Sequence, residues 1–85
     1  MVKWKIVFTR QARRDGKMIA AAGLRQNAEN LRGILCENPF QIPPPYETLV
    51  GDLSGAYSRR INIQHRLVNQ VLDDIKTVKI IRMWT

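Results

Sequence analysis

The residue types best suited to chemistry gather between positions 47 and 66 of the 85-residue chain. They comprise two carboxylates, a tyrosine, three arginines and a histidine: Glu47, Asp52, Tyr57, Arg59, Arg60, His65 and Arg66. An arginine suits a phosphate because its planar guanidinium donates two parallel hydrogen bonds and stays charged at any relevant pH. The ring of Tyr57, beside two arginines, could carry an unstacked base. This stretch therefore predicts contact with a nucleic acid.

A carboxylate among arginines can also act as a general base if a hydroxyl comes within its reach. RNA carries such a hydroxyl at the 2′ position, next to its own phosphate. Glu47 is the candidate base, and the arrangement would suit RNA cleavage. The alternative is that Glu47 only neutralises an arginine in a structural ion pair, the commoner fate of a glutamate near an arginine. The pattern leaves both interpretations open.

His65 is the only histidine and invites a catalytic role. Alternation along a strand would turn its side chain to the face opposite Arg66, so the two cannot readily line one site. We therefore expect a structural His65, held by a turn hydrogen bond. The chain has no second histidine and no cysteine pair at metal-ligand spacing, so we expect neither a metal nor another cofactor.

The charge of the chain is strongly positive, with 14 Lys and Arg against 7 Asp and Glu and a formal net charge of +7. Such a surface attracts anions, and nucleic acid is the leading class of partner. Charge alone would fit an acidic protein partner, or simple solubility, equally well. The single cysteine, Cys36, cannot form an internal disulfide. With no basic leader and no apolar run near the roughly 20 residues of a membrane span, we expect a cytoplasmic protein without a membrane role.

The elements that must position these residues follow from local patterns. Alternation over Val2–Phe8 predicts a half-buried strand. Thr9 can cap a helix that runs through the alanines at 20–22 and ends at Gly23. A second apolar stripe, at Leu24, Ala28, Leu31 and Leu35, predicts another helix, which stops at Asn38 because Pro39 follows.

Residues 39–45 contain all four prolines and form a stiff connecting loop. After it we predict four strands, over Glu47–Val50, Tyr57–Asn62, Arg66–Leu72 and Thr77–Trp84. The short connections favour antiparallel pairing. The expected fold is a single α+β domain over residues 1–85: an N-terminal strand, a two-helix hairpin and a four-stranded antiparallel sheet, with the hairpin on one sheet face and the other face free.

Several of these segments resemble the YoeB/Txe toxins of the RelE superfamily. The likeness rests on the proline-rich loop with Pro39-Phe40, on Tyr46-Glu47, on the run from Gly51 to Asn62 that reads GDLSGAYSRRIN, and on the HRLV run from His65 to Val68. It extends over essentially the whole chain.

The resemblance implies a microbial-ribonuclease-like fold and a ribosome-dependent endoribonuclease that cuts mRNA. It also implies a YefM-like antitoxin as partner, with DNA reached only through that antitoxin and a homodimer as a further option. Carried over by residue, Glu47 matches the general base and Arg66 the phosphate-stabilising arginine. Arg59 and Arg60 match an arginine pair that either contacts RNA or supports the fold.

Three departures from the family bear on activity. Relatives continue past the last strand with a His-Tyr pair whose histidine resembles the general acid, whereas this chain stops at Trp84-Thr85. Thr48 and Val50 stand near Glu47 where relatives often have a lysine, and Asn69 stands where they usually have a tyrosine. The resemblance therefore implies an impaired nuclease.

Two other functions stay open from the sequence. One is an inactive toxin that binds its antitoxin or the ribosome and acts as a co-repressor. The other is a relative of the gyrase-poisoning ParE toxins, since a shared fold does not determine function. The matches at Glu47 and Arg66 favour the nuclease over both.

Overall fold

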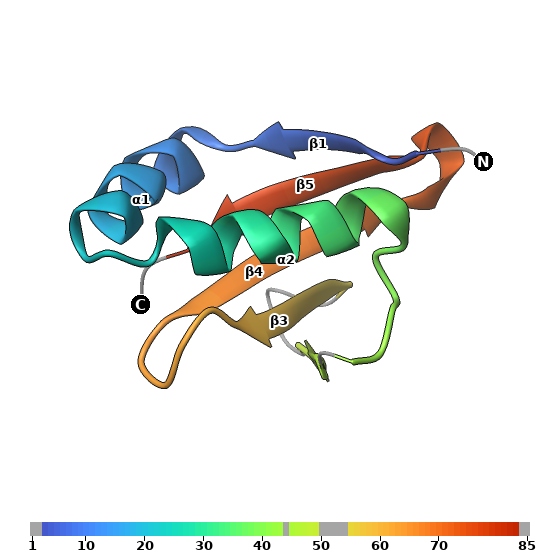
Figure 1. The fold of residues 1–85 in the computed structure, drawn as a ribbon. Coiled ribbons are helices and arrows are strands. Elements are labelled where there is room, and N and C mark those ends of the chain that lie inside the picture. Colours follow the sequence, from blue (N-terminus) through green and yellow to red (C-terminus); the bar gives the residue numbers. More distant parts are fainter. Residues whose placement is uncertain (1–2, 44, 50–54, 84–85) are drawn as a thin grey trace.

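A computed structural model of the chain describes residues 3–43, 45–49 and 55–83. Two helices and five strands follow one another along the chain: β1 (Lys5–Phe8), α1 (Arg10–Ala21), α2 (Arg25–Glu37), β2 (Glu47–Thr48), β3 (Ala56–Arg60), β4 (Arg66–Leu72) and β5 (Thr77–Arg82). The helices lie together on one side of a twisted sheet (Figure 1). This arrangement confirms the predicted α+β class and the order of its elements.

Helix α1 begins and ends where its sequence predicts. The Thr9 hydroxyl accepts a hydrogen bond from the main-chain N–H of Ala12 at 3.0 Å, which satisfies one of the free N–H groups of the first turn. The same hydroxyl donates to the carbonyl of Ile81 in β5 at 2.7 Å. Gly23 follows the helix with φ +76, a backbone conformation that glycine adopts without steric cost. One threonine thus starts the helix and fastens it to the sheet.

Helix α2 turns its apolar stripe to the sheet. Leu31 and Leu35 are buried, and Leu24 and Ala28 pack partly buried against the same core. Asn38, just beyond the helix, has the extended conformation expected of a residue before proline. The stripe predicted from the sequence is therefore the face that closes the core.

The sheet has five strands in the order β1-β5-β4-β3-β2. The pairs β2–β3, β3–β4 and β4–β5 are antiparallel, as the short connections predict. Strand β1 adds to the edge of this sheet, parallel to β5, with Lys5 opposite Thr77 and Phe8 opposite Ile80. The sheet is therefore mixed and five-stranded, rather than four antiparallel strands beside a separate N-terminal strand. Hydrogen bonds between β1 and β5, which lie about seventy positions apart in the sequence, determine this placement.

Some strand ends differ from the prediction. Strand β4 has the predicted bounds, whereas β3 ends at Arg60 because Ile61 and Asn62 turn back and donate to the carbonyl of His65. Strand β5 ends at Arg82. Val2, Val50 and Trp84, the outer ends of three predicted strands, lie outside the described residues, as does the segment 51–54.

The core lies between the helix pair and the sheet. Its buried residues come from both helices, from β4 and β5 and from the segments that follow β3 and β5: Ala12, Ile19, Leu31, Leu35, Ile61, Leu67, Val78, Ile80 and Met83. A carboxylate is buried beside them. Asp15 of α1, 1% exposed, accepts hydrogen bonds from the main-chain N–H of Met83 at 3.0 Å and from the Gln11 amide at 2.8 Å. Asp15 thus fastens the residue after β5 to α1.

Candidate active site

The register of three strands brings the predicted catalytic residues to one face of the sheet. Glu47 lies opposite Ser58, and Arg60 lies opposite Arg66. Directly paired residues share a face, and so do residues two apart along a strand. Glu47, Ser58, Arg60 and Arg66 therefore project from the same face. The core residue Leu67 follows Arg66 and points to the opposite face, so the candidate site lies away from the helices.

Glu47 and Arg66 form an ion pair in this site. The distance from Nη1 of Arg66 to Oε2 of Glu47 is 3.3 Å, and the side chains are 39% and 66% exposed respectively. Exposed ion pairs contribute only about 0–1 kcal/mol to stability because water and salt screen them. The pair is thus of little use to the fold, while its carboxylate and guanidinium stay open to an incoming molecule.

A hollow of about 240 Å³ surrounds this pair. Its lining joins the edge strand β2 and the residues before it to β3 and β4: Pro45, Tyr46, Glu47, Ser58, Arg60 and Arg66. Arg60 makes no ion pair with any described residue, so two guanidinium groups face one carboxylate here. The Glu47 carboxylate can accept a proton, and the two guanidinium groups can bind negative charge. This combination suits a substrate in which a hydroxyl lies next to a phosphate.

Tyr46 and Ser58 also line this hollow, although the sequence did not identify either of them as a candidate site residue. Ser58 is buried, two positions before Arg60 and opposite Glu47. The period of two along β3 is a signal that could have placed Ser58 with Arg60. Tyr46 precedes β2, which has only two residues, so alternation along a strand could not have placed Tyr46 in the hollow.

Arg59, adjacent to Arg60, points to the other face and is buried, with 1% of its surface exposed. Its Nη2 donates to the carbonyl of Pro39 at 3.0 Å, and its guanidinium lies 4.8 Å from the centre of the Tyr46 ring. Burial lowers the pKa of Arg59 below its ordinary value, against a smaller raising effect of Tyr46. Of the two roles left open for Arg59, this position favours support of the fold, because a buried guanidinium cannot reach an RNA phosphate.

Tyr57 also lies away from the hollow. Its ring meets Phe40 edge-on at 5.6 Å and Tyr46 edge-on at 5.3 Å, and its side chain is half-buried. These three rings, with Arg59, hold the proline-rich loop against β3. Tyr57 is therefore occupied by packing contacts in this structure, and Tyr46 is the aromatic residue that lines the hollow.

The family of the chain can be decided from its sequence. A profile of the YoeB-like toxins of bacterial type II toxin-antitoxin systems matches residues 8–84. The chain belongs to this family. A comparison with curated protein sequences gave no match.

Solved structures of YoeB toxins share the fold. The YoeB/ParE toxin from Agrobacterium tumefaciens is 27% identical, with a TM-score of 0.84 over 94% of this chain and 95% of that one. The YoeB-YefM complex from Staphylococcus aureus contains a chain that is 30% identical, with a TM-score of 0.81 over 96% and 95%. The YoeB dimer from the same organism gives the same values. The strand-helix-helix-sheet order is thus the YoeB fold.

His65 of this YoeB-like chain is buried outside the hollow. Its main-chain N–H donates to the Asn62 side chain at 2.7 Å, and its carbonyl accepts from the N–H of Ile61 at 2.8 Å. The residue closes the turn between β3 and β4. Asp52, the other carboxylate of the stretch, lies outside the described residues.

Two other kinds of site are absent from the ranges that the structure describes. No group of three or more His, Cys, Asp or Glu residues could hold a metal ion there. Among the helices that the structure describes, none is long and apolar enough to cross a membrane.

Proposed function

We propose that this YoeB-like toxin is an endoribonuclease that cuts mRNA on the ribosome. The observation that carries the proposal is the Glu47 carboxylate, accessible to solvent and 3.3 Å from the Arg66 guanidinium, in a hollow that Arg60 also lines. The carboxylate supplies a base and the two arginines supply positive charge, so the reaction needs no metal. The family implies the same roles for Glu47 and Arg66.

The reaction begins at the RNA 2′ hydroxyl. Glu47 accepts its proton, and the oxygen attacks the adjacent phosphorus to form a five-coordinate phosphorane with added negative charge. Arg66 and Arg60 stabilise that charge, a contribution that is large when the donors are already in place. The bond from phosphorus to the 5′ oxygen then breaks. The products are a 2′,3′-cyclic phosphate and, after the leaving oxygen takes up a proton, a 5′ hydroxyl.

We infer that this site catalyses departure of the 5′ oxygen less well than it catalyses attack by the 2′ oxygen. No described residue of the hollow is a histidine, so none of them supplies an imidazole to protonate the leaving oxygen. A positioned general acid contributes a factor of about 10² to 10⁴ in rate. The chain should therefore cleave slowly while binding its substrate normally.

A direct experiment tests the catalytic assignment. Translating ribosomes, with a chelator present, are incubated with the chain, and mRNA ends are mapped. We expect slow cleavage that leaves 2′,3′-cyclic phosphates, and its loss in Glu47→Gln and in Arg66→Ala. Glu37→Gln is a matched control, because Glu37 is also an exposed partner in a 3.3 Å ion pair, with Lys3 of another surface.

The leaving-group inference has its own test. A His-Tyr pair, added after Thr85 or substituted for Trp84 and Thr85, should raise cleavage by about 10² to 10⁴ with ribosome affinity nearly unchanged. Glu47→Gln in the same background should cancel the gain. No gain from either form, or a gain that survives Glu47→Gln, would show that the proposed roles are wrong.

A non-catalytic function is the second candidate, and the lack of a described imidazole in the hollow favours it. In that case the chain would bind the ribosome or an antitoxin, and act as a co-repressor, without cutting RNA. Tight ribosome binding with no mapped cuts would support this function over the nuclease.

We also propose a YefM-like antitoxin as the partner, with contact to DNA only through it, and the cytoplasm as the compartment. Structures of Staphylococcus aureus homologues, one a YoeB-YefM complex and one a YoeB dimer, support an antitoxin and a homodimer here. The net charge of +7 favours an acidic partner segment that folds on contact. If the antitoxin encoded beside this gene fails to raise the melting temperature of the chain, the proposed partner is wrong.

A further inference from the structure

Helix α1 carries a surface of concentrated positive charge on the helix side of the sheet, away from the candidate active site. Its cationic residues are three arginines and a lysine: Arg10, Arg13, Arg14 and Lys17. At 3.6 residues per turn they fall within about 100° of arc around the helix. The buried residues of the helix occupy the opposite side: Ala12, Asp15 and Ile19. We call the four cations the α1 cationic stripe.

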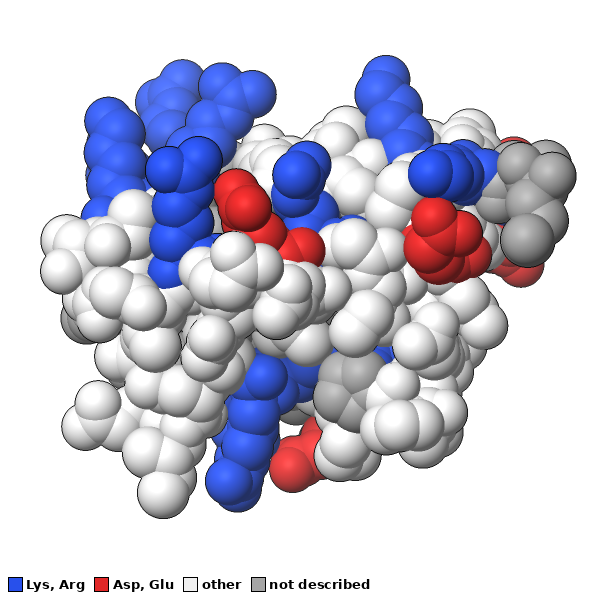
Figure 2. Space-filling model, viewed as in Figure 1, with Lys and Arg blue, Asp and Glu red and all other residues white. Residues whose placement is uncertain are grey.

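The charges of the α1 cationic stripe are open to a partner. All four residues are exposed, and none forms an ion pair with a residue that the structure describes. Asp15, the one carboxylate of the helix, is buried and accepts hydrogen bonds from the Met83 N–H and the Gln11 amide instead. Lys and Arg side chains gather over α1 in the surface view (Figure 2).

The arrangement of these charges disfavours the helix that carries them. Residues three and four apart are neighbours on a helix surface, and like charges there repel. The stripe contains such neighbours throughout: Arg10–Arg13, Arg10–Arg14, Arg13–Lys17 and Arg14–Lys17. Its first turn also holds cations and no acidic residue, although the helix dipole disfavours cations at that end. A local cost without a compensating contact among the described residues indicates a functional surface.

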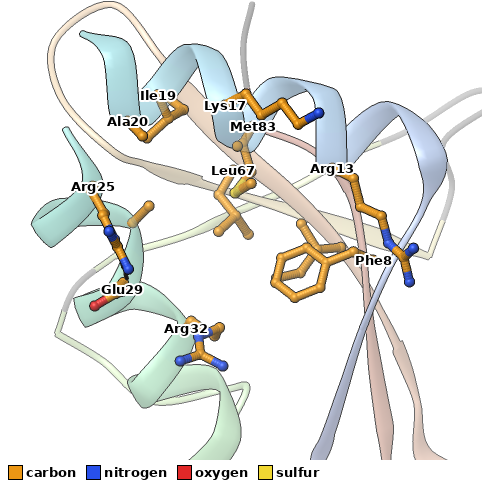
Figure 3. Close-up of a pocket in the computed structure, with 13 residues that line it drawn as sticks. Phe8, Arg13, Lys17, Ile19, Ala20, Arg25, Glu29, Arg32, Leu67 and Met83 are labelled. Atoms are coloured by element: carbon orange, nitrogen blue, oxygen red, sulfur yellow. Dashed lines mark hydrogen bonds and ion pairs between the residues drawn. The ribbon is translucent and has the colours of Figure 1, made fainter. Parts of the chain in front are cut away.

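The composition of the stripe suits a phosphate backbone better than a protein. Arginine donates two parallel hydrogen bonds to a phosphate, and phosphate contacts need only charge. Protein interfaces have an apolar core, and the stripe contains no large apolar side chain. Apolar surface begins beside it, in a hollow of about 370 Å³ between α1 and α2, which Arg13, Lys17 and Met83 line (Figure 3). Arg10 and Arg14 lie outside that lining.

Two features of α1 favour double-stranded over single-stranded RNA. The helix has no aromatic residue on which an unpaired base could stack, and stacking holds much of single-stranded RNA. The stripe is also straight and rigid, running about 10 Å along the helix axis from Arg10 to Lys17 at 1.5 Å per residue. Double-stranded RNA is recognised by its regular shape and its phosphates, which such a row of cations fits.

We propose that the α1 cationic stripe binds the phosphate backbone of double-stranded RNA. The catalytic hollow opens on the other face of the sheet, so the RNA bound by α1 is not the strand next to Glu47 and Arg66. Ribosomal RNA presents double-stranded segments around the mRNA, and the stripe holds the chain to them. This choice of RNA rests on the proposed function, whereas binding by the stripe does not depend on cleavage.

The binding test uses the full chain with Glu47→Gln, which keeps RNA intact, and a fluorescent RNA hairpin. Arg10→Gln with Arg14→Gln should weaken hairpin binding about fivefold or more and make the slope of log affinity against log salt shallower by about 2. Lys5→Gln with Lys79→Gln removes the same charge from exposed residues of the other sheet face and should change affinity less than about twofold. Equal losses would overturn the proposal, because net charge alone would explain them.

The free chain provides a second readout, which separates binding from support of the fold. Arg10→Gln with Arg14→Gln removes all but one of the like-charge pairs and a cation of the first turn, and glutamine is as good a helix former as arginine. The melting temperature without RNA should therefore rise by about 3–6 °C. A melting temperature that does not rise would overturn the proposal, since the stripe would then cost the fold nothing.

Three further probes identify the partner. Arg10→Gln with Arg14→Gln, in the Glu47→Gln chain, should weaken ribosome binding as it weakens hairpin binding, and unchanged ribosome binding would overturn the proposal. So would an equal loss for an RNA that cannot form base pairs. A polyglutamate peptide with the charge of the hairpin should bind more weakly than the hairpin, and equal or tighter binding would identify a protein site instead. None of these measurements involves cleavage, so a failure of the nuclease proposal gives a different result.

Discussion

The neighbouring residues Arg59 and Arg60 have the same chemistry and opposite environments. Arg59 is buried, donates to the Pro39 carbonyl and covers the Tyr46 ring, whereas Arg60 is exposed in the hollow. A hydrogen bond to a charged group contributes about 1.5–3 kcal/mol. Arg59→Met should therefore lower the free energy of unfolding by about that amount, and Arg60→Met should lower it by less than ~0.5 kcal/mol while it reduces cleavage.

Urea denaturation of both variants, with cleavage on ribosomes as the second measurement, checks this pair. The folded fraction of Arg59→Met should keep most of the RNA affinity. An equal loss of stability in the two variants, or a normal rate for Arg60→Met, would contradict the proposed division of roles.

Asn69 is a polar residue in a buried position that offers its side chain no hydrogen bond. It is fully buried in β4, and neither atom of its side-chain amide has a hydrogen-bond partner among the described residues. A buried amide without a partner costs about 1–3 kcal/mol by the measure of protein mutants. Asn69→Leu, of similar size, should therefore raise the free energy of unfolding by about 1 kcal/mol, measured by urea denaturation. Gln70→Leu, on the half-buried next position, is the control and should change little.

At the scale of elements, two polar side chains, one at the N-terminus of α1 and one within it, hold α1 to the end of β5. The Thr9 hydroxyl reaches the Ile81 carbonyl, and the Asp15 carboxylate accepts from the N–H of Met83. The two contacts join residues that are 72 and 68 positions apart in the sequence. They fix where the chain runs after β5, beside the hollow between α1 and α2 that Met83 lines.

Loss of the Asp15 contact should be costly because the N–H of Met83 is buried with it. A buried donor left without a partner costs about 1–3 kcal/mol, so Asp15→Ala should destabilise the chain by that amount. Gln11→Ala removes the other partner of Asp15, at the exposed side, and should cost less than ~1 kcal/mol. Thermal or urea unfolding measures both, and a cost of Asp15→Ala no greater than that of Gln11→Ala would contradict the assignment.

At the scale of the whole molecule, the cationic residues of α1 and the catalytic hollow lie on different sides of the sheet. Arg10, Arg13, Arg14 and Lys17 of α1 lie on the helix side, and the Glu47–Arg66 hollow lies on the other side of the sheet. The net charge of +7 should speed the encounter with any anion, over a range set by the Debye length of about 10 Å at 0.1 M salt.

Association of the proposed acidic antitoxin should therefore depend on salt more than its dissociation does. Between low and high salt, the association rate should fall about tenfold or more, and the dissociation rate should change less than about threefold, because apolar contacts hold the bound partner segment. Stopped-flow fluorescence measures both rates. A dissociation rate that rises as steeply as the association rate falls would mean that the bound state is held by charge alone.

Much of this fold follows from local patterns in the sequence. The helix limits at Thr9, Gly23 and Asn38 depend on backbone preferences and caps that act within a few residues, and the structure confirms them. The apolar stripes of the helices and the alternation of β1 likewise identify the residues that face the core. The prediction that Glu47 and Arg66 act together came from family resemblance, and the structure pairs their side chains.

The features that depend on contacts between distant segments could be determined only from the tertiary structure. The parallel place of β1 at the edge is set by hydrogen bonds to β5, which no local pattern encodes. Neighbouring residues of a strand point to opposite faces, but only the packing of the proline-rich loop shows that Arg59, and not Arg60, is the buried one. The hollow of about 370 Å³ between α1 and α2 likewise exists only where these helices and the sheet meet, because its lining comes from separate segments of the chain.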